Sequence, residues 1–223
     1  MKQNVTEIDS QDYRDYVIKD GRFIGEFEQM YRNIDDPWGT VENVGSLKNN
    51  LLLALIAHIN SVHQIDRALH AGCALGALTA RLKKTLGESS QVWGCDISET
   101  AINKATASYP GIDFLVHDLA DIQSVSFPKG SLDLIVMAET MWYVLPWLAE
   151  IMAYFHALLQ PGGHLVLQQY FLPPGQQTYG NEIVSTPEDL LKSVVESGFS
   201  IRHQMNLDPG QNHCFMLWAS ARE

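Results

Sequence analysis

Short apolar segments alternate with helical segments through most of the chain, and this alternation limits the possible folds more than any other feature. Residues 65–71 form an apolar run that ends at Gly72, after which Leu78, Leu82 and Leu86 recur at helical spacing. Strands that alternate with helices indicate a mostly parallel sheet with helices on both faces. We therefore expect an α/β fold.

The alternation continues to residue 170 and then changes. Two apolar runs, 199–207 and 213–220, flank turn residues at 208–211 and predict a terminal antiparallel hairpin. A Pro-Gly-Gly stop at 161–163 is expected to precede the fifth strand. The expected sheet thus has seven strands. Before the hairpin we predict strands at 65–71, 91–95, 112–117, 131–138 and 164–170, and helices at 43–60, 75–86, from Ser98, at 145–159 and at 186–197.

A length of 223 residues suits one hydrophobic core, because chains divide into separate cores only above roughly 250 residues. Residues 1–42 carry aromatic side chains at helical spacing. We expect them to form a helical or lid segment in front of a core domain formed by residues 43–223.

The composition excludes several classes of partner. A formal net charge of −11 argues against nucleic acid, which is bound by clustered Lys and Arg. The apolar run 51–59 is far shorter than the ~20 residues that cross a bilayer. The amino terminus is polar and lacks the apolar core of a secretory signal, so we expect a cytoplasmic protein. Three widely spaced cysteines fit reduced thiols.

A glycine-bearing turn, Leu-His-Ala-Gly-Cys-Ala-Leu-Gly-Ala-Leu-Thr at residues 69–79, predicts a ligand site. Gly72 and Gly76 let the backbone approach a ligand closely, and Asp96 follows about twenty residues later, where a carboxylate binds ribose hydroxyls. The alternative is a turn that only packs a helix on a strand. Ala74 replaces the middle glycine of a dinucleotide-binding turn, which favours a nucleoside without pyrophosphate, such as S-adenosylmethionine (SAM), over NAD.

At these residues the sequence resembles class I SAM-dependent methyltransferases, and more closely the NodS-type family of N-methyltransferases that act on a chitooligosaccharide amine. The resemblance covers about residues 35–170. It implies a Rossmann-like class I methyltransferase fold, SAM as cofactor and S-adenosyl-L-homocysteine (SAH) as product. The segments that carry it are Asp-Pro-Trp at 36–38, Gly-Cys-Ala-Leu-Gly-Ala-Leu-Thr at 72–79, Asp-Ile at 96–97, Asp-Leu-Ile-Val-Met-Ala-Glu at 133–139 with Tyr143, and Leu-Gln-Pro-Gly-Gly-His-Leu-Val at 159–166.

The resemblance also implies which residues contact the cofactor. Asp96 would hold the ribose hydroxyls and Asp118 the adenine amino group, although Asp118 has an alternative as a solvated loop acid. His70 stands where the superfamily usually has an acid that helps to hold the cofactor's ammonium. Three alternatives follow: altered cofactor contacts, a pH-sensitive site, or a fold that binds poorly. The implied cofactor residues are His70, Gly72, Cys73, Gly76, Asp96, Ile97, Asp118, Leu119 and Ala138.

Acceptor residues are expected after the fourth predicted strand. Glu139 is the candidate base or ammonium-orienting carboxylate, and Tyr143 is a hydrogen-bond donor beside it. The alternative for Glu139 is a simple helix-start acid. Aromatic side chains wall cationic and sugar sites. The aromatic candidates for acceptor contacts are Tyr31, Trp38, Trp142, Tyr170 and Tyr179.

These residues predict methyl transfer to a small polar acceptor, first an amine of a sugar-like or natural-product intermediate. O-methylation of a sugar, a phosphorylated or phosphoramidate-like intermediate or a natural product is the first alternative. A non-catalytic member of the fold that binds SAM or a nucleoside is the second. The eight histidines and three cysteines lack metal-ligand spacing, so we expect no metal. The expected partner is a small molecule, with neither nucleic acid nor membrane, and the protein a monomer or homodimer.

Overall fold

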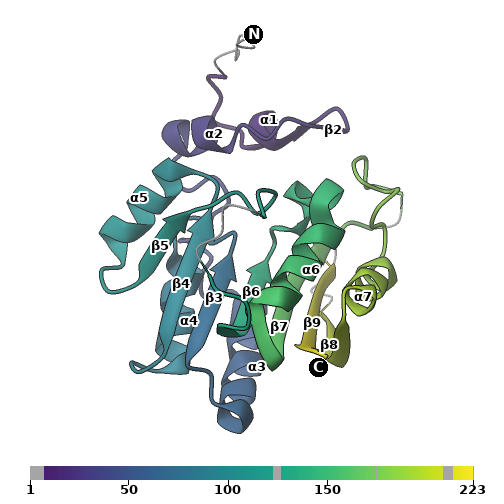
Figure 1. The fold of residues 1–223 in the computed structure, drawn as a ribbon. Helices are drawn as coiled ribbons and strands as arrows, with labels where there is room; N and C mark the ends of the chain where they lie inside the picture. Colours follow the sequence, from purple (N-terminus) through teal and green to yellow (C-terminus); the bar gives the residue numbers. More distant parts are fainter. Residues whose placement is uncertain (1–7, 123–126, 174, 208–212, 223) are drawn as a thin grey trace.

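The computed structural model describes residues 8–122, 127–173, 175–207 and 213–222 and has one seven-stranded sheet at its centre (Figure 1). The strand order is β5-β4-β3-β6-β7-β9-β8. Neighbours are parallel from β5 to β7, whereas β7–β9 and β9–β8 are antiparallel. The predicted mostly parallel sheet with a terminal hairpin is confirmed. The strands are β3 (Arg67–Ala71), β4 (Gln91–Asp96), β5 (Asp113–Val116), β6 (Leu132–Ala138), β7 (Leu159–Phe171), β8 (Phe199–Leu207) and β9 (His213–Ala221).

Helices cover both faces of the sheet, as the sequence predicts. Along β6, Leu134 and Val136 belong to one hydrophobic cluster, and Ile135 between them belongs to another. Helices α3 and α4 complete the first cluster, and α6 and α7 the second. Helix α5 packs against β4 and β5. The helices are α3 (Leu47–His63), α4 (Ala77–Leu86), α5 (Glu99–Ser108), α6 (Leu148–Leu158) and α7 (Pro187–Glu196).

Several predicted boundaries differ from the structure. Helix α3, expected at 43–60, runs from Leu47 to His63. Strand β7 begins at Leu159 rather than at residue 164, because Leu159 already pairs with Leu132 of the neighbouring strand β6. Residues 161–163 therefore form an irregularity within the strand, not a stop before it. The helix expected from residue 145 begins at Leu148, after two short 3₁₀ turns, η1 (Met141–Tyr143) and η2 (Leu145–Trp147). The hairpin turn expected at 208–211 lies outside the described residues.

The amino-terminal segment lies above the sheet in Figure 1, with α2 next to α5. Glu28 of α2 accepts hydrogen bonds from Ser98 Oγ (2.7 Å) and Thr100 Oγ1 (2.6 Å), at the start of α5. The Lys104 ammonium donates to the Tyr31 carbonyl at 2.9 Å. These contacts hold the segment against the carboxyl end of β4. Its elements are α1 (Arg14–Val17), β1 (Ile18–Lys19), β2 (Arg22–Phe23) and α2 (Phe27–Asn33).

The three cysteines Cys73, Cys95 and Cys214 are buried and unbridged. In the described part of the chain, no helix combines the length and the apolar character needed to span a bilayer.

Candidate functional site

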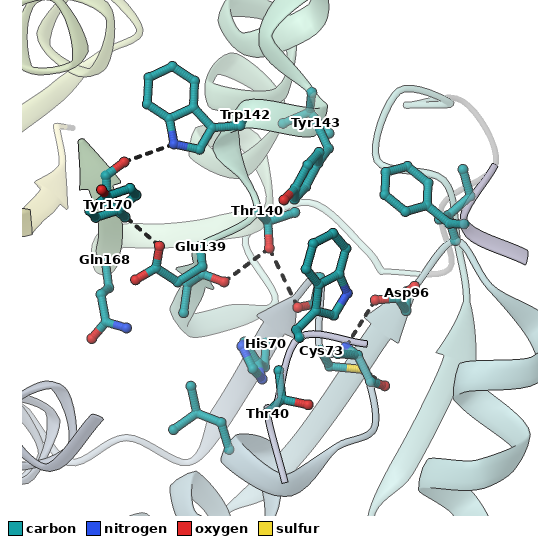
Figure 2. A pocket seen from close by; sticks show the side chains of 18 of the residues that line it. Thr40, His70, Cys73, Asp96, Glu139, Thr140, Trp142, Tyr143, Gln168 and Tyr170 are labelled. Atoms are coloured by element: carbon teal, nitrogen blue, oxygen red, sulfur yellow. Dashed lines mark hydrogen bonds between the residues drawn. The ribbon is translucent and has the colours of Figure 1, made fainter. Parts of the chain in front are cut away.

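A pocket of about 840 Å³ lies at the carboxyl ends of the parallel strands. Strand β3 lies between β4 and β6, so the chain leaves β3 toward one side of the sheet and later returns to its other side. Open α/β sheets bind ligands at this point, where the direction of winding reverses. Residues from the amino-terminal segment and from the start of α3 complete the walls. Figure 2 shows Asp96 on one side of the pocket, Glu139 and Gln168 on the other, and His70 and Cys73 between them.

The glycine turn after β3 brings bare backbone to the pocket. Gly72 has φ +73°, and a Cβ at this position would overlap the Thr140 side chain. Ala74 also adopts a left-handed φ of +51°. Gly76 does not line the pocket, contrary to its predicted cofactor contact. A Cβ there would lie 2.7 Å from the Phe114 ring, so Gly76 instead permits close packing of α4 against β5.

Asp96, at the end of β4, presents its carboxylate to the pocket. One oxygen accepts from Ala74 N at 2.9 Å and the other from Ser98 N at 3.1 Å, which leaves each oxygen able to accept again. Burial raises the pKa of Asp96, although the backbone hydrogen bonds from Ser98 and Ala74 oppose this shift. Ile97 and Leu119 line the same end of the pocket. Asp118 lies there too, exposed, and one of its oxygens accepts from Ala120 N at 2.9 Å.

His70 is the penultimate residue of β3 and is 3% exposed. Its Nδ1 lies 2.8 Å from Thr79 Oγ1, and its buried Nε2 has no hydrogen-bond partner in the described structure. Burial lowers the pKa of His70 to about 4, so the ring is neutral between pH 6 and pH 8. The alternative of a pH-sensitive site therefore loses its basis in that range.

Glu139 follows β6 and is held by contacts from two other elements. One carboxylate oxygen lies 2.7 Å from Lys48 Nζ, at the start of α3, and the other accepts from Tyr170 N at 3.0 Å. Glu139 also has φ +60°, an arrangement that costs a non-glycine residue about 1–3 kcal/mol. The fold therefore keeps this carboxylate at the pocket in spite of local strain.

Aromatic rings form the wall beneath the amino-terminal segment. Tyr143 lies 5.4 Å from Phe27 and 5.3 Å from Trp38 between ring centroids. Burial raises the pKa of Tyr143, so its hydroxyl keeps its proton at neutral pH. Tyr31 is 2% exposed and accepts from Trp38 Nε1 at 2.9 Å, so it fixes the indole that faces the pocket.

The remaining aromatic candidates lie farther along the wall. Trp142 lines the pocket and donates Nε1–H to the Tyr170 carbonyl at 2.8 Å. Tyr179 does not line the pocket, contrary to prediction. Its ring stacks on the Phe23 ring, with 5.9 Å between the ring centroids, so Tyr179 packs against the amino-terminal segment and not at the pocket. All the other predicted site residues do line the pocket.

Three residues of the pocket carry no sequence signal that predicts a site. Lys48 and Asn49 lie in the first turn of an ordinary amphipathic helix, and Gln168 lies inside a buried strand. Gln168 is 1% exposed and donates to Asn49 Oδ1 at 3.3 Å. A glutamine at an otherwise apolar strand position is the only available hint, because buried polar side chains need partners.

The residues of the pocket fit a nucleoside cofactor that carries an amino-acid group. The Gly72 turn leaves room that a Cβ would fill, Asp96 offers two oxygens that can accept, and His70 Nε2 is a buried polar atom without a partner. A volume of about 840 Å³ lies in the upper range for small-molecule sites. Among the described residues, no group of three or more His, Cys, Asp or Glu is arranged to hold a metal ion.

Comparison with known proteins agrees with this geometry. Residues 68–163 match the sequence-family model described as "Methyltransferase domain". No curated protein sequence matches the chain. Among solved structures, N-methyltransferase NodS from Bradyrhizobium japonicum WM9 in complex with SAH superposes with a TM-score of 0.65 at 20% identity, over 85% of this chain and 93% of that one.

Two further solved structures show the range of proteins with this fold. Magnesium protoporphyrin IX methyltransferase (ChlM) from Synechocystis PCC 6803 with bound SAM has a TM-score of 0.58 at 19% identity, over 78% of this chain and 79% of that one. The [4+2]-cyclase SpnF has a TM-score of 0.65 at 15% identity, over 78% and 80%. At these identities the structures establish a Rossmann-like methyltransferase fold. Together with the matched domain, they support a class I SAM-dependent methyltransferase.

Proposed function

We propose that the protein transfers a methyl group from SAM to a small polar acceptor, and that this acceptor is an amine on a sugar-like or natural-product intermediate. The observation that carries the proposal is the meeting of Asp96 and Glu139 in one pocket. Asp96, at the end of β4, would bind the nucleoside, and Glu139 lies across the sheet, directly after β6. The similarity to N-methyltransferase NodS favours an amine.

The chain's own residues would position both ligands. Asp96 would accept from the ribose hydroxyls, while Ile97 and Leu119 would cover the adenine ring. Ala138 would lie beside the transferable methyl, and Trp38 would close the acceptor side. Alignment of the two reacting atoms in a site closed to water supplies much of the rate enhancement in such a displacement.

Bound SAM supplies an electrophilic methyl on a sulfonium and a neutral thioether as leaving group. An acceptor amine would use its lone pair to form the new N–C bond in exchange for the C–S bond, whose electron pair would stay on sulfur. The methylated nitrogen would then lose one proton, and Glu139 is our candidate to receive it. Lys48 and the Tyr170 amide hold this carboxylate, and Tyr143, which lines the same pocket, would supply a hydroxyl donor.

The direct test is methyl transfer from isotope-labelled SAM to a panel of amino sugars and matched hydroxyl sugars. We expect label in the amines. Glu139→Gln should lower turnover by about 100-fold or more, the scale of a lost acid–base group, and leave SAH affinity unchanged. Glu150→Gln, an exposed acid on α6, is the matched control.

Each other result would support one of the alternative functions or remove Glu139 from the proposed one. Label in hydroxyl acceptors alone would establish the O-methyltransferase alternative. SAH binding without transfer to any acceptor would favour a non-catalytic member of the fold. The [4+2]-cyclase SpnF indicates that this fold also occurs in a protein named for another reaction. Full activity in Glu139→Gln would remove Glu139 from the mechanism.

A further inference from the structure

The imidazole of His70 is a buried polar group with one ring nitrogen satisfied and the other without a partner in the described structure. The side chain lines the pocket from the end of β3 and is almost completely buried. Its Nδ1 contacts Thr79 Oγ1, and among the described residues Nε2 has no hydrogen-bond partner. A buried polar atom without a partner is unfavourable, so such an atom in a residue that lines a pocket indicates a ligand contact.

The hydrogen-bonding needs of Thr79 determine which ring nitrogen carries the proton. Thr79 is fully buried on α4, and His70 Nδ1 is its only hydrogen-bond partner among the described residues. If Nδ1 carried the proton, the hydroxyl hydrogen of Thr79 would have no acceptor. If the hydroxyl donates to Nδ1, it is satisfied and the ring proton lies on Nε2. The low pKa of His70, about 4, keeps the ring in this neutral form at pH 7. Nε2–H is therefore a donor with no acceptor among the described residues.

Other donors line the pocket near the start of α3. Ser46 Oγ, at the N-cap, is buried and without a partner. The first-turn amides of this 17-residue helix have no partners within the helix, and its dipole favours negative charge there. The Lys48 ammonium in the same turn pairs with Glu139 and is not one of these donors. This set of donors matches a carboxylate.

An acceptor lies on the same face of the sheet as His70. His70 pairs with Val136 of β6, Ala138 lies two residues further on the same face, and Ala138 pairs with Gln168. Gln168 Oε1 is buried and without a partner. A carbonyl oxygen in this position matches an ammonium. An α-amino-acid group needs donors for its carboxylate and an acceptor for its ammonium, and this pocket contains both.

We propose that His70 donates Nε2–H to the carboxylate of the cofactor's amino-acid part, that Gln168 Oε1 accepts from its ammonium, and that Thr79 is a positioning residue that fixes the tautomer of His70. The proposal rests on the proposed function, because it requires SAM and SAH as ligands. It assigns His70 the opposite role to an acid at this position, since an acid accepts from the ammonium.

Calorimetric titration with SAH and with 5′-methylthioadenosine, which lacks the amino-acid part, tests the proposal. The wild-type protein should bind both and bind SAH more tightly. His70→Leu should weaken SAH by roughly 10–100-fold, the scale of a hydrogen bond to a charged group, and leave 5′-methylthioadenosine unchanged. His70→Gln, whose amide N–H reaches the place of Nε2–H, should retain most of the SAH affinity.

Contrary outcomes separate this inference from the proposed function. Binding of neither nucleoside by the wild type would overturn both. Equal affinity for both nucleosides would overturn the inference alone. Tighter SAH binding in His70→Asp would show that the contact is to the ammonium.

The tautomer is measurable without any ligand and without activity. In ¹⁵N NMR spectra of the wild-type protein, His70 should carry its proton on Nε2. Thr79→Val should shift the ring toward a mixture of tautomers and weaken SAH in parallel. Thr85→Val, on the same helix, removes a hydroxyl that bonds only the Arg81 carbonyl and should change neither readout. A proton on Nδ1 in the wild type would overturn the proposal.

Discussion

The end of the pocket that we assign to the nucleoside consists of backbone and one carboxylate, whereas the end that we assign to the acceptor consists of side chains from three distant segments. At the nucleoside end, the Gly72 turn and Asp96 meet through hydrogen bonds between two adjacent strand ends. At the acceptor end, Lys48, Glu139 and Tyr170 come from α3, β6 and β7.

This difference separates what is common to the fold from what is particular to this chain. A turn and a carboxylate at two neighbouring strand ends follow directly from the order of the strands. The acceptor end depends on how α3 and the amino-terminal segment pack over the sheet. We therefore expect substitutions at the nucleoside end to change cofactor affinity, and those at the acceptor end to change turnover or acceptor recognition.

The largest effect is expected from Gly72→Ala at the nucleoside end. The left-handed φ and the overlap with Thr140 should together destabilise the fold by about 2–4 kcal/mol, and SAH binding should be lost. Urea unfolding and calorimetry measure the two effects. Gly162→Ala is the matched control, because Gly162 has φ +76° but open space around its Cβ position. Equal destabilisation in both variants would show that the close approach to Thr140 is unimportant.

Asp96→Asn should weaken SAH by roughly 10–100-fold, because an amide offers the ribose hydroxyls one acceptor and no charge. Asp118→Asn, an exposed acid in the same pocket, should have a smaller effect.

The raised pKa of Asp96 adds a pH dependence that titration of SAH at several pH values measures. Protonation removes the charged acceptor, so wild-type SAH affinity should fall as the pH is lowered, starting at a higher pH than for an ordinary aspartate. The dependence should vanish in Asp96→Asn. If it persisted there, another group would be responsible.

Lys48→Met tests whether the ammonium of Lys48 orients the Glu139 carboxylate at the acceptor end. Loss of the ammonium frees the Glu139 carboxylate to rotate, and turnover should fall about tenfold while SAH affinity changes by less than about threefold. The double variant with Glu139→Gln should be no worse than Glu139→Gln alone, since both act through one carboxylate. Lys192→Met, from an exposed ion pair with Glu196, is the control. Additive losses would show that Lys48 acts independently of Glu139.

The smallest effect is expected from Glu28→Gln, which weakens the bonds between α2 and the start of α5. The amino-terminal segment carries Trp38 over the acceptor end, so the acceptor KM should rise by about fivefold, corresponding to about 1 kcal/mol. Glu99→Gln, an exposed acid in the first turn of α5, should leave KM unchanged. An altered SAH affinity with an unchanged acceptor KM would show that the amino-terminal segment contributes to cofactor binding and not to acceptor binding.

Local patterns predicted the strands, the order of elements and two residues of the pocket, Gly72 and Asp96. The Gly72 turn and Asp96 come at the ends of two successive apolar strands. In a parallel sheet such strand ends lie at the same edge, so the two features were expected to meet. The pairing of Lys48 with Glu139 was not predictable, because it joins residues 91 positions apart and Lys48 looks like any solvated helix residue. Tyr179 and Gly76 were misplaced for a similar reason, since the residues they contact, Phe23 and Phe114, are set by tertiary packing.

Titration of the purified protein with SAM, SAH and NAD decides whether the pocket is a SAM site. We expect micromolar binding of SAM and SAH at a single site, abolished in Gly72→Ala, and no binding of NAD, because Ala74 replaces the glycine that a pyrophosphate needs. Binding of NAD in place of SAM and SAH, or of none of the three by the folded protein, would show that the pocket is not a SAM site.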